Sequence, residues 1–217
     1  MDKLARLDNA FTKAVEIINE RLWSKKYFTS VHYLNNMGTF QKLLVSKNDL
    51  DINSLATYLV SANILLVQEE YIDLLPDDVL VILTIHELLH FFSANRAKNI
   101  TGYKTDEFWP SSYNEGCTQW LALRLFYGDE YKEGLKSNFV YPKSVDSIDK
   151  LVDIFGEDVI FQGYFYNDLK MSSDLMDKSK KHIWVDIFIN MGFSAEEHTF
   201  EDNIKHWQSL IDEYKRQ

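Results

Sequence analysis

The chain has 217 residues, of which 46 % are hydrophobic and 14 % aromatic, so it can bury a core and is neither disordered nor fibrous. Its formal net charge is −10 and it has no basic stripe, which argues against a nucleic-acid-binding or membrane-binding protein. A single cysteine, Cys117, excludes an intramolecular disulfide. With only 8 glycines and 3 prolines, the composition favours helices over an all-β sandwich.

The N-terminal part of the chain mixes helical and strand-like segments. Residues 8–23 carry apolar side chains at helical spacing and predict an amphipathic helix. Residues 27–34 and 39–45, rich in aromatic and β-branched residues, flank an Asn-Asn-Met-Gly sequence and predict a β-hairpin. The segment 52–60 is ambiguous, with a short helix as one interpretation, whereas 64–67 is typical of a buried strand.

The middle of the chain is predicted to form two long helices. Pro76, followed by two aspartates, is a typical helix start, and this helix is expected to run to about Asn95. Apolar residues lie on nearly every side of this helix, which indicates that the helix is buried. After a loop over 98–109, a second helix is predicted to begin at Pro110 and to end at Gly128.

The remaining chain shows the same helical character. Further helices are predicted over 144–155, 158–171, 180–191 and 200–214. Because no repeat, low-complexity tract or linker interrupts the chain, residues 1–217 are expected to form a single domain. We predict a mainly helical α+β fold, in which residues 1–97 supply a small sheet packed on the buried helix and residues 98–217 supply a helical lobe.

The sequence shows neither a signal peptide nor a membrane-spanning segment, and these features bear on where in the cell the protein is expected. The N-terminus has no apolar run followed by a small-residue cleavage site. No apolar stretch approaches the roughly 18–20 residues that span a bilayer. Together with the lone cysteine, this favours a cytoplasmic protein, and secretion without a visible signal is the alternative.

The buried helix carries the sequence H-E-L-L-H over residues 86–90. Because residues four apart share a helix face, His86 and His90 can reach one zinc ion at about 2.0–2.1 Å. Glu87 lies beside the open metal position in this motif, where it can take a proton from bound water. Burying three such residues among apolar ones is costly unless they are paired or bind a metal, which favours a metal site over two core histidines.

A catalytic zinc site usually has three protein ligands and one position for water, so a further ligand is needed. Glu115, at the start of the second helix, is the first candidate because it can face the buried helix. Alternatively, Glu115 closes a capping box with Ser112. Asp106 in the intervening loop and Cys117, as a thiolate, are rivals for the third position. Cys117 is also explained as a small buried hydrophobic residue.

H-E-L-L-H, followed after 24 intervening residues by N-E-G, resembles the gluzincin metallopeptidases, whose third zinc ligand is a glutamate on a later helix. The resemblance covers only residues 85–120. It implies a zincin-like domain that binds Zn²⁺ through His86, His90 and Glu115, with Glu87 as the general base. The Gly-Ala-Met-Glu-Asn substrate motif of the aminopeptidase branch is absent, so exopeptidase action is not implied.

The resemblance also implies a group that stabilises the oxyanion of the reaction. Gluzincins commonly supply a tyrosine or a histidine from downstream helices, and the candidates are Tyr164, Tyr166 and His182. Each of them is also explained as a packing or surface residue. In such enzymes an edge strand pairs with the extended substrate, and we expect the segment 63–69 to have this role.

The sequence therefore predicts a zinc-dependent hydrolase, in the first place a metallopeptidase that cleaves peptide bonds with a zinc-activated water. Its expected partner is a peptide or protein substrate. The alternative is a non-catalytic zinc protein, whose metal cross-links two helices or creates a partner-binding surface. A hydrolase of a non-peptide amide or ester is a third possibility.

Overall fold

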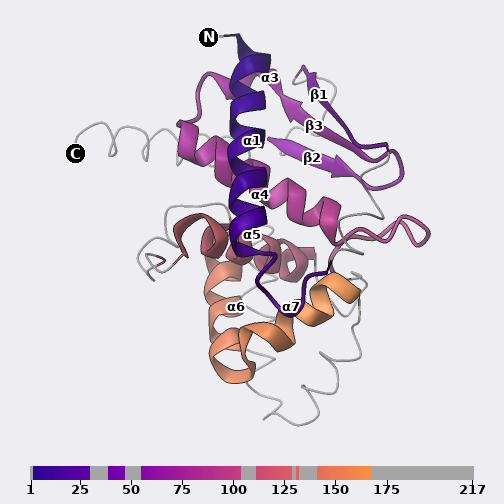
Figure 1. Cartoon of the computed structure of the whole chain (residues 1–217), viewed down its shortest axis with the longest axis vertical. Helices are drawn as coiled ribbons and strands as arrows, with labels where there is room; N and C mark the ends of the chain where they lie inside the picture. The colour runs from indigo at the N-terminus through magenta and orange to yellow at the C-terminus, as the bar shows by residue number, and fades with distance from the viewer. Residues whose placement is uncertain are drawn as a thin grey trace.

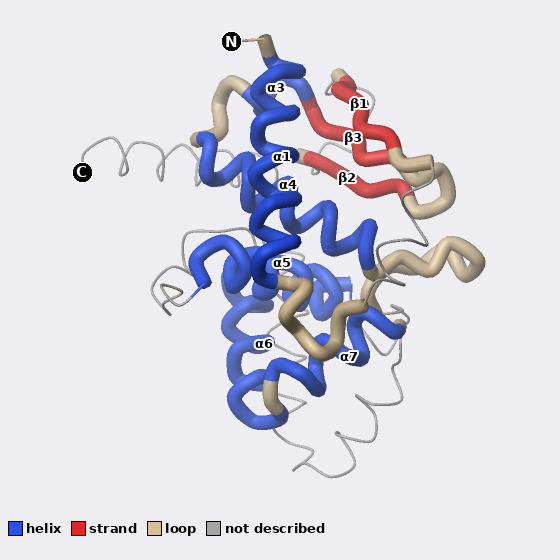
Figure 2. Tube along the Cα trace, viewed as in Figure 1, coloured by secondary structure: helices blue, strands red, loops and turns tan. Residues whose placement is uncertain are grey.

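A computed structural model of the chain describes residues 2–29, 39–46, 55–103, 111–128, 131 and 141–167. These residues form six helices and a three-stranded mixed sheet near the N-terminus, so the prediction of a mainly helical α+β fold is confirmed (Figure 2). None of the described helices is long and apolar enough to cross a bilayer. The helices predicted over 180–191 and 200–214 lie outside the described residues.

Helix α1 (Lys3–Arg21) is the amphipathic helix expected near the N-terminus, but it begins earlier than predicted. The carboxylate of Asp2 caps it by accepting the backbone N–H of Leu4 at 3.3 Å. Its buried side chains recur every three or four residues, namely Leu7, Ala10, Ala14 and Ile18. This single apolar face packs mainly on helix α4 (Asp77–Phe92).

The sheet contains β1 (Gln41–Val45), β2 (Ala56–Leu59) and β3 (Ile64–Gln68) in the order β1-β3-β2. Strand β3 pairs in parallel with β1 and antiparallel with β2. The buried strand predicted at 64–67 is therefore confirmed. The ambiguous segment 52–60 forms strand β2 in its described part and not a short helix. Asn63 adopts a left-handed conformation (φ 58°) in the turn that joins β2 to β3.

The predicted hairpin of 27–34 with 39–45 is not observed in the described residues. The partner of β1 is β3, residues 27–29 are not in a strand, and 30–34 lie outside the described residues. Tyr27 packs its ring on Phe161 and Phe165 at centroid distances of 5.6 and 5.8 Å. Its aromatic character thus serves core packing and not strand pairing.

Helix α4 follows the short helix α3 (Glu69–Ile72) and is buried on nearly every side, as predicted. It packs against α1, strand β2 and helix α5 (Ser111–Tyr127). In Figure 1, α4 crosses the molecule between the sheet and the helices that follow. Helix α5 ends where expected, since Gly128 takes a positive φ of 56°.

The helical lobe continues with α6 (Pro142–Phe155) and α7 (Glu157–Tyr166), which lie at the end of the molecule away from the sheet (Figure 1). Helix α6 packs on α5, and α7 packs on both. Helix α7 ends earlier than the predicted 158–171, because Asn167 adopts a left-handed conformation with φ 54°. The architecture thus places α5 between the buried helix α4 and the C-terminal helices.

Candidate metal centre

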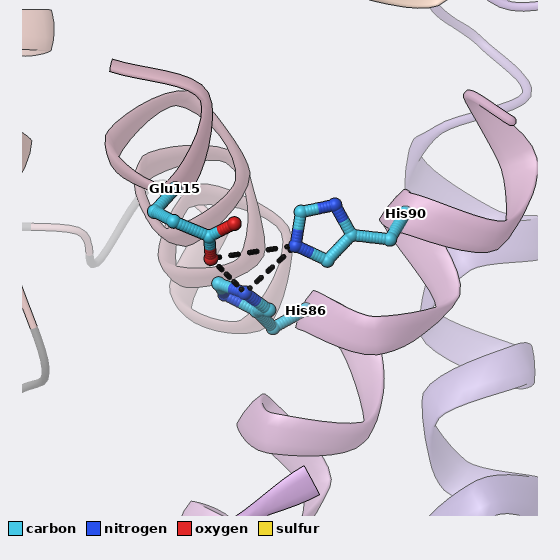
Figure 3. Close-up of side chains that lie close together, drawn as sticks. All are labelled: His86, His90 and Glu115. Atoms are coloured by element: carbon cyan, nitrogen blue, oxygen red, sulfur yellow. Dashed lines mark hydrogen bonds and ion pairs between the residues drawn. The ribbon is translucent and has the colours of Figure 1, made fainter. Parts of the chain in front are cut away.

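Three side chains from α4 and α5 meet at one point between the two helices (Figure 3). His86 and His90 lie one turn apart on α4, with 3.1 Å between their Nε2 atoms. Oε2 of Glu115 on α5 lies 3.2 Å from Nε2 of His86 and 3.4 Å from Nε2 of His90. The structure therefore brings together the three residues predicted to bind zinc.

The spacing of these atoms fits a metal ion. Four ligands placed tetrahedrally at 2.0–2.1 Å from zinc are separated from one another by about 3.3 Å. The three observed separations of 3.1, 3.2 and 3.4 Å are close to this value. Two imidazole nitrogens and one carboxylate oxygen also form a donor set found in catalytic zinc sites. The group can hold a metal ion.

A glutamine on α5 orients the first histidine. Nδ1 of His86 lies 2.9 Å from Oε1 of Gln119, which only accepts hydrogen bonds. Nδ1 therefore carries the hydrogen, and the lone pair of Nε2 faces Glu115. Gln119 was not identified from the sequence, although its spacing of four residues from Glu115 places both on one face of α5.

A threonine supports the second histidine. Thr101, in the segment that follows α4, donates a hydrogen bond to the carbonyl oxygen of His90 at 2.6 Å. Its Oγ1 also lies 3.4 Å from Nδ1 of His90. Since the hydroxyl hydrogen is used on the carbonyl, Oγ1 accepts from Nδ1, which again leaves Nε2 for the metal group.

Glu115 is suited to bind a cation. Burial would raise the pKa of its carboxyl group, but His90 and His86 together hold that pKa well below its usual range. Its carboxylate faces these histidines, which supports the ligand assignment over the capping box. The side chain of Ser112, the other half of that box, lies outside the described residues.

Glu87 lies next to the metal group without belonging to it. Only 6 % of its surface is exposed. Burial, with a contribution from Glu115, raises the pKa of Glu87 to about 7, although His86 and the backbone N–H of Tyr58 on β2 lower it. The hydrogen bond from Tyr58 ties this carboxylate to the strand that packs on α4.

Of the two rival ligands, only Cys117 lies among the described residues, and it is not part of this group. Cys117 is completely buried, burial raises the pKa of its thiol, and it lies outside the donor cluster formed by the described residues. Asp106 lies outside the described residues.

Three residues were predicted as candidates for stabilising the oxyanion. His182 lies outside the described residues. The hydroxyl of Tyr164 bonds to Oγ1 of Thr118 at 2.8 Å in the core, and Tyr166 is 53 % exposed.

A tyrosine that the sequence did not indicate contacts a histidine of the metal group. The ring of Tyr141 stacks on that of His86, with 6.5 Å between centroids and 18° between planes. Its backbone is left-handed (φ 62°) immediately before Pro142, which is a strained conformation for a residue with a side chain. Burial raises the pKa of this phenol, and Glu115 and Glu87 raise it further.

The glycine of the N-E-G triplet explains how Tyr141 reaches this position. A Cβ atom on Gly116 would lie 2.8 Å from Cβ of Ser144 and 3.3 Å from Cγ1 of Ile148, both on α6. Only glycine allows α6 to approach α5 this closely. The contact brings Tyr141, the residue before α6, next to the metal group.

The prediction that the segment 63–69 forms an edge strand is wrong. Strand β3 is the central strand and is paired on both sides, so it has no free edge for a substrate. In the described sheet the edges belong to β1 and β2. Strand β2 is the one that packs on α4 and bonds to Glu87.

No family model, curated protein or solved structure matches this chain. The interpretation of the site therefore depends on its own residues and their geometry.

Proposed function

We propose that this protein is a zinc-dependent hydrolase, and specifically a metallopeptidase. One observation carries the proposal: three side chains that could bind a metal converge, and a buried carboxylate outside this donor set, that of Glu87, lies next to them. A structural zinc site would typically be closed by four protein ligands, whereas a catalytic one has three and a separate base. Zinc bound by His86, His90 and Glu115 would polarise a carbonyl group and lower the pKa of a bound water.

In this proposal Glu87 moves the proton. It accepts a proton from the attacking water as the C–O bond forms, and it gives that proton to the amine nitrogen as the C–N bond breaks. The backbone N–H of Tyr58 holds the carboxylate in place. A base that is fixed by the fold needs no rearrangement before proton transfer.

Tyr141 is the proposed donor to the substrate oxygen. Its ring is stacked on a ligand histidine, and its strained backbone is held by the packing of α6 on α5. Strain of this kind is concentrated at functional sites. A phenol in this position can donate a hydrogen bond as negative charge develops on the carbonyl oxygen.

The outer edge of β2 is the proposed binding edge for an extended peptide. Gln68 donates its N–H to the carbonyl oxygen of Leu55, so Tyr58, three residues on, directs its backbone groups away from β3. These groups lie beside Glu87. Because the N–H of Tyr58 is used by Glu87, a peptide would pair with the other outward groups of this edge, such as the carbonyl oxygen of Tyr58, and its backbone would lie near the proposed base.

The decisive experiment compares wild type with Glu87→Gln on a peptide library, with zinc content measured in both. We expect a loss of roughly 10²–10⁴-fold in kcat/KM with zinc retained. Tyr141→Phe should lower kcat by about 10²-fold or more. Cys117→Ser serves as the control and should stay active, since Cys117 does not touch the group. An unchanged rate in zinc-loaded Glu87→Gln would overturn the mechanism. Zinc binding without hydrolysis of any peptide, amide or ester would favour the non-catalytic alternative.

A further inference from the structure

The two histidines of the metal group are supported by different kinds of structure. His86 is oriented by Gln119, which belongs to helix α5 and is buried in it. His90 is oriented by Thr101, which lies in the non-helical segment after α4. The distance of 3.4 Å from Thr101 Oγ1 to Nδ1 of His90 exceeds the usual 2.7–3.2 Å of an N–H···O bond. A shift of a few tenths of an ångström would therefore make or break this contact.

The position of Thr101 is set by its neighbours in the same segment. Oγ of Ser93 accepts the backbone N–H of Gly102 at 2.9 Å and lies 2.9 Å from Oγ1 of Thr101. The next residue, Tyr103, donates its N–H to Oδ1 of Asn114 at 2.9 Å. The segment is thus bonded to the end of α4 and to α5 through Thr101 and the two residues that follow it.

A third tie comes from the end of α7, far away in the sequence. The side-chain amide of Asn167 donates to the carbonyl oxygens of Ser93 at 2.9 Å and of Gly102 at 2.7 Å. It therefore bridges both ends of the segment that carries Thr101. Asn167 reaches these carbonyls because its left-handed backbone ends α7 at this point.

We propose that Asn167 and Thr101 form a positioning relay for His90, through which the end of α7 sets the metal affinity of the group. Asn167 fixes the Ser93–Gly102 segment, this segment fixes Thr101, and Thr101 fixes the ring of His90. The inference shares with the proposed function the premise that the group binds a metal, but it does not depend on hydrolysis.

The test measures zinc affinity, by competition with a chromophoric chelator, and the visible spectrum of the Co²⁺-substituted protein. Thr101→Val removes the hydroxyl group at nearly constant shape and should weaken zinc binding by about 10–100-fold. Thr101→Ser keeps the hydroxyl group and should bind like wild type. Asn167→Gly keeps the left-handed backbone but loses both donors, and it should weaken binding by up to about tenfold. Gln162→Ala, at an exposed position of α7, is the matched control and should change nothing.

The double variant separates a relay from two independent effects. If Asn167 acts through Thr101, Thr101→Val with Asn167→Gly should bind zinc no more weakly than Thr101→Val alone. The Co²⁺ spectrum should shift in Thr101→Val and Asn167→Gly, because a change in the orientation of His90 alters the ligand field, and should stay unchanged in Gln162→Ala.

Wild-type affinity and spectrum in Thr101→Val, or additive losses in the double variant, would overturn the relay while leaving the proposed function intact. Absence of zinc binding in wild type would instead remove the premise of both. Because every comparison is made on binding and spectrum, a lack of peptidase activity would not affect the outcome.

Discussion

Helices α1 and α4 pack against each other but bury very different side chains. Helix α1 buries one apolar face, and the rest of its surface is at least partly exposed. Helix α4 buries 12 of its 16 residues, and these include the polar side chains of Thr84, His86, Glu87 and His90. Burial of apolar groups stabilises a fold, whereas burial of polar groups costs free energy unless they are paired. The buried face of α1 therefore contributes mainly to stability, whereas the buried polar residues of α4 cost stability and indicate a functional role.

The largest expected effect is the loss of metal when Glu115, the acidic ligand on α5, is removed and only the two histidines of α4 remain. Wild type should contain about one zinc per chain, and Glu115→Ala should contain none. The reason is that two imidazoles alone offer neither the third donor nor the negative charge. Elemental analysis after reconstitution measures the result.

Cys117→Ser is the matched control for this experiment, because it changes the same helix two residues away. It should keep its zinc, since the thiol is buried outside the group. Zinc lost from Cys117→Ser would contradict the assignment of Glu115 as the third ligand. Wild type without zinc after reconstitution would mean that α4 buries its histidines for another reason.

The next effect concerns the apolar face of α1. Ile18 is completely buried, so Ile18→Ala should lower the free energy of unfolding by about 2–5 kcal/mol. Zinc stoichiometry should be unchanged under native conditions, because α1 contributes no ligand. Urea unfolding measures the first quantity, with the exposed Glu20→Ala as control. If Ile18→Ala lost zinc but kept its stability, the assignment of stability to α1 and metal binding to α4 would be contradicted.

A pH-dependent effect should distinguish the buried acid of α4 from the apolar residues of α1. In the metal-free protein, the pKa of Glu87 is raised from its ordinary value of 4.5 to about 7. The folded state then binds the proton more tightly than the unfolded state, so this group's contribution to stability is lost as the pH rises from about 4.5 to about 7. The loss is at most about 3 kcal/mol and is absent in Glu87→Gln.

Urea unfolding of both proteins in the presence of a chelator, at pH 5 and at pH 8, measures this difference. Relative to wild type, Glu87→Gln should become more stable at the higher pH. Ile18→Ala should be destabilised equally at the two values, because no ionisable group is involved. If the free energies of unfolding of wild type and Glu87→Gln differed by the same amount at pH 5 and at pH 8, the expected titration of Glu87 would be contradicted.

The smallest expected effect concerns the contact of Arg6 that joins helix α1 to the start of helix α4. The guanidinium group of Arg6 on α1 donates to the carbonyl oxygens of Ile72 and Leu75 and to the carboxylate of Asp77 at the start of α4. Arg6→Met leaves these partly buried carbonyls without their donor and should cost about 1–3 kcal/mol. Thermal unfolding measures the cost. Lys13→Met, which removes the exposed ion pair with Asp78, is the control and should cost less than about 1 kcal/mol.

Local patterns were reliable where the elements are long. The two central helices and the strand at 64–67 follow from apolar spacing, the Pro-Asp-Asp helix start and the terminating Gly128. The β2 strand was missed because four residues carry little periodic signal, and its identity depends on pairing with β3. For the same reason the sequence does not reveal that the segment 63–69 contains the central strand of the sheet.

The sequence alone predicts His86, His90 and Glu115 as the metal group, with Asp106 and Cys117 as rivals for the third ligand. His86 and His90 share a face because a helix repeats every 3.6 residues, and Glu115 was indicated by its place at the start of the following helix. Only the tertiary structure decided what surrounds them. Gln119, Thr101 and Tyr141 reach the histidines through the packing of α5, of the segment after α4 and of α6. Contacts between segments distant along the chain leave no periodic pattern, because they depend on how the elements pack and not on the conformation of any one of them.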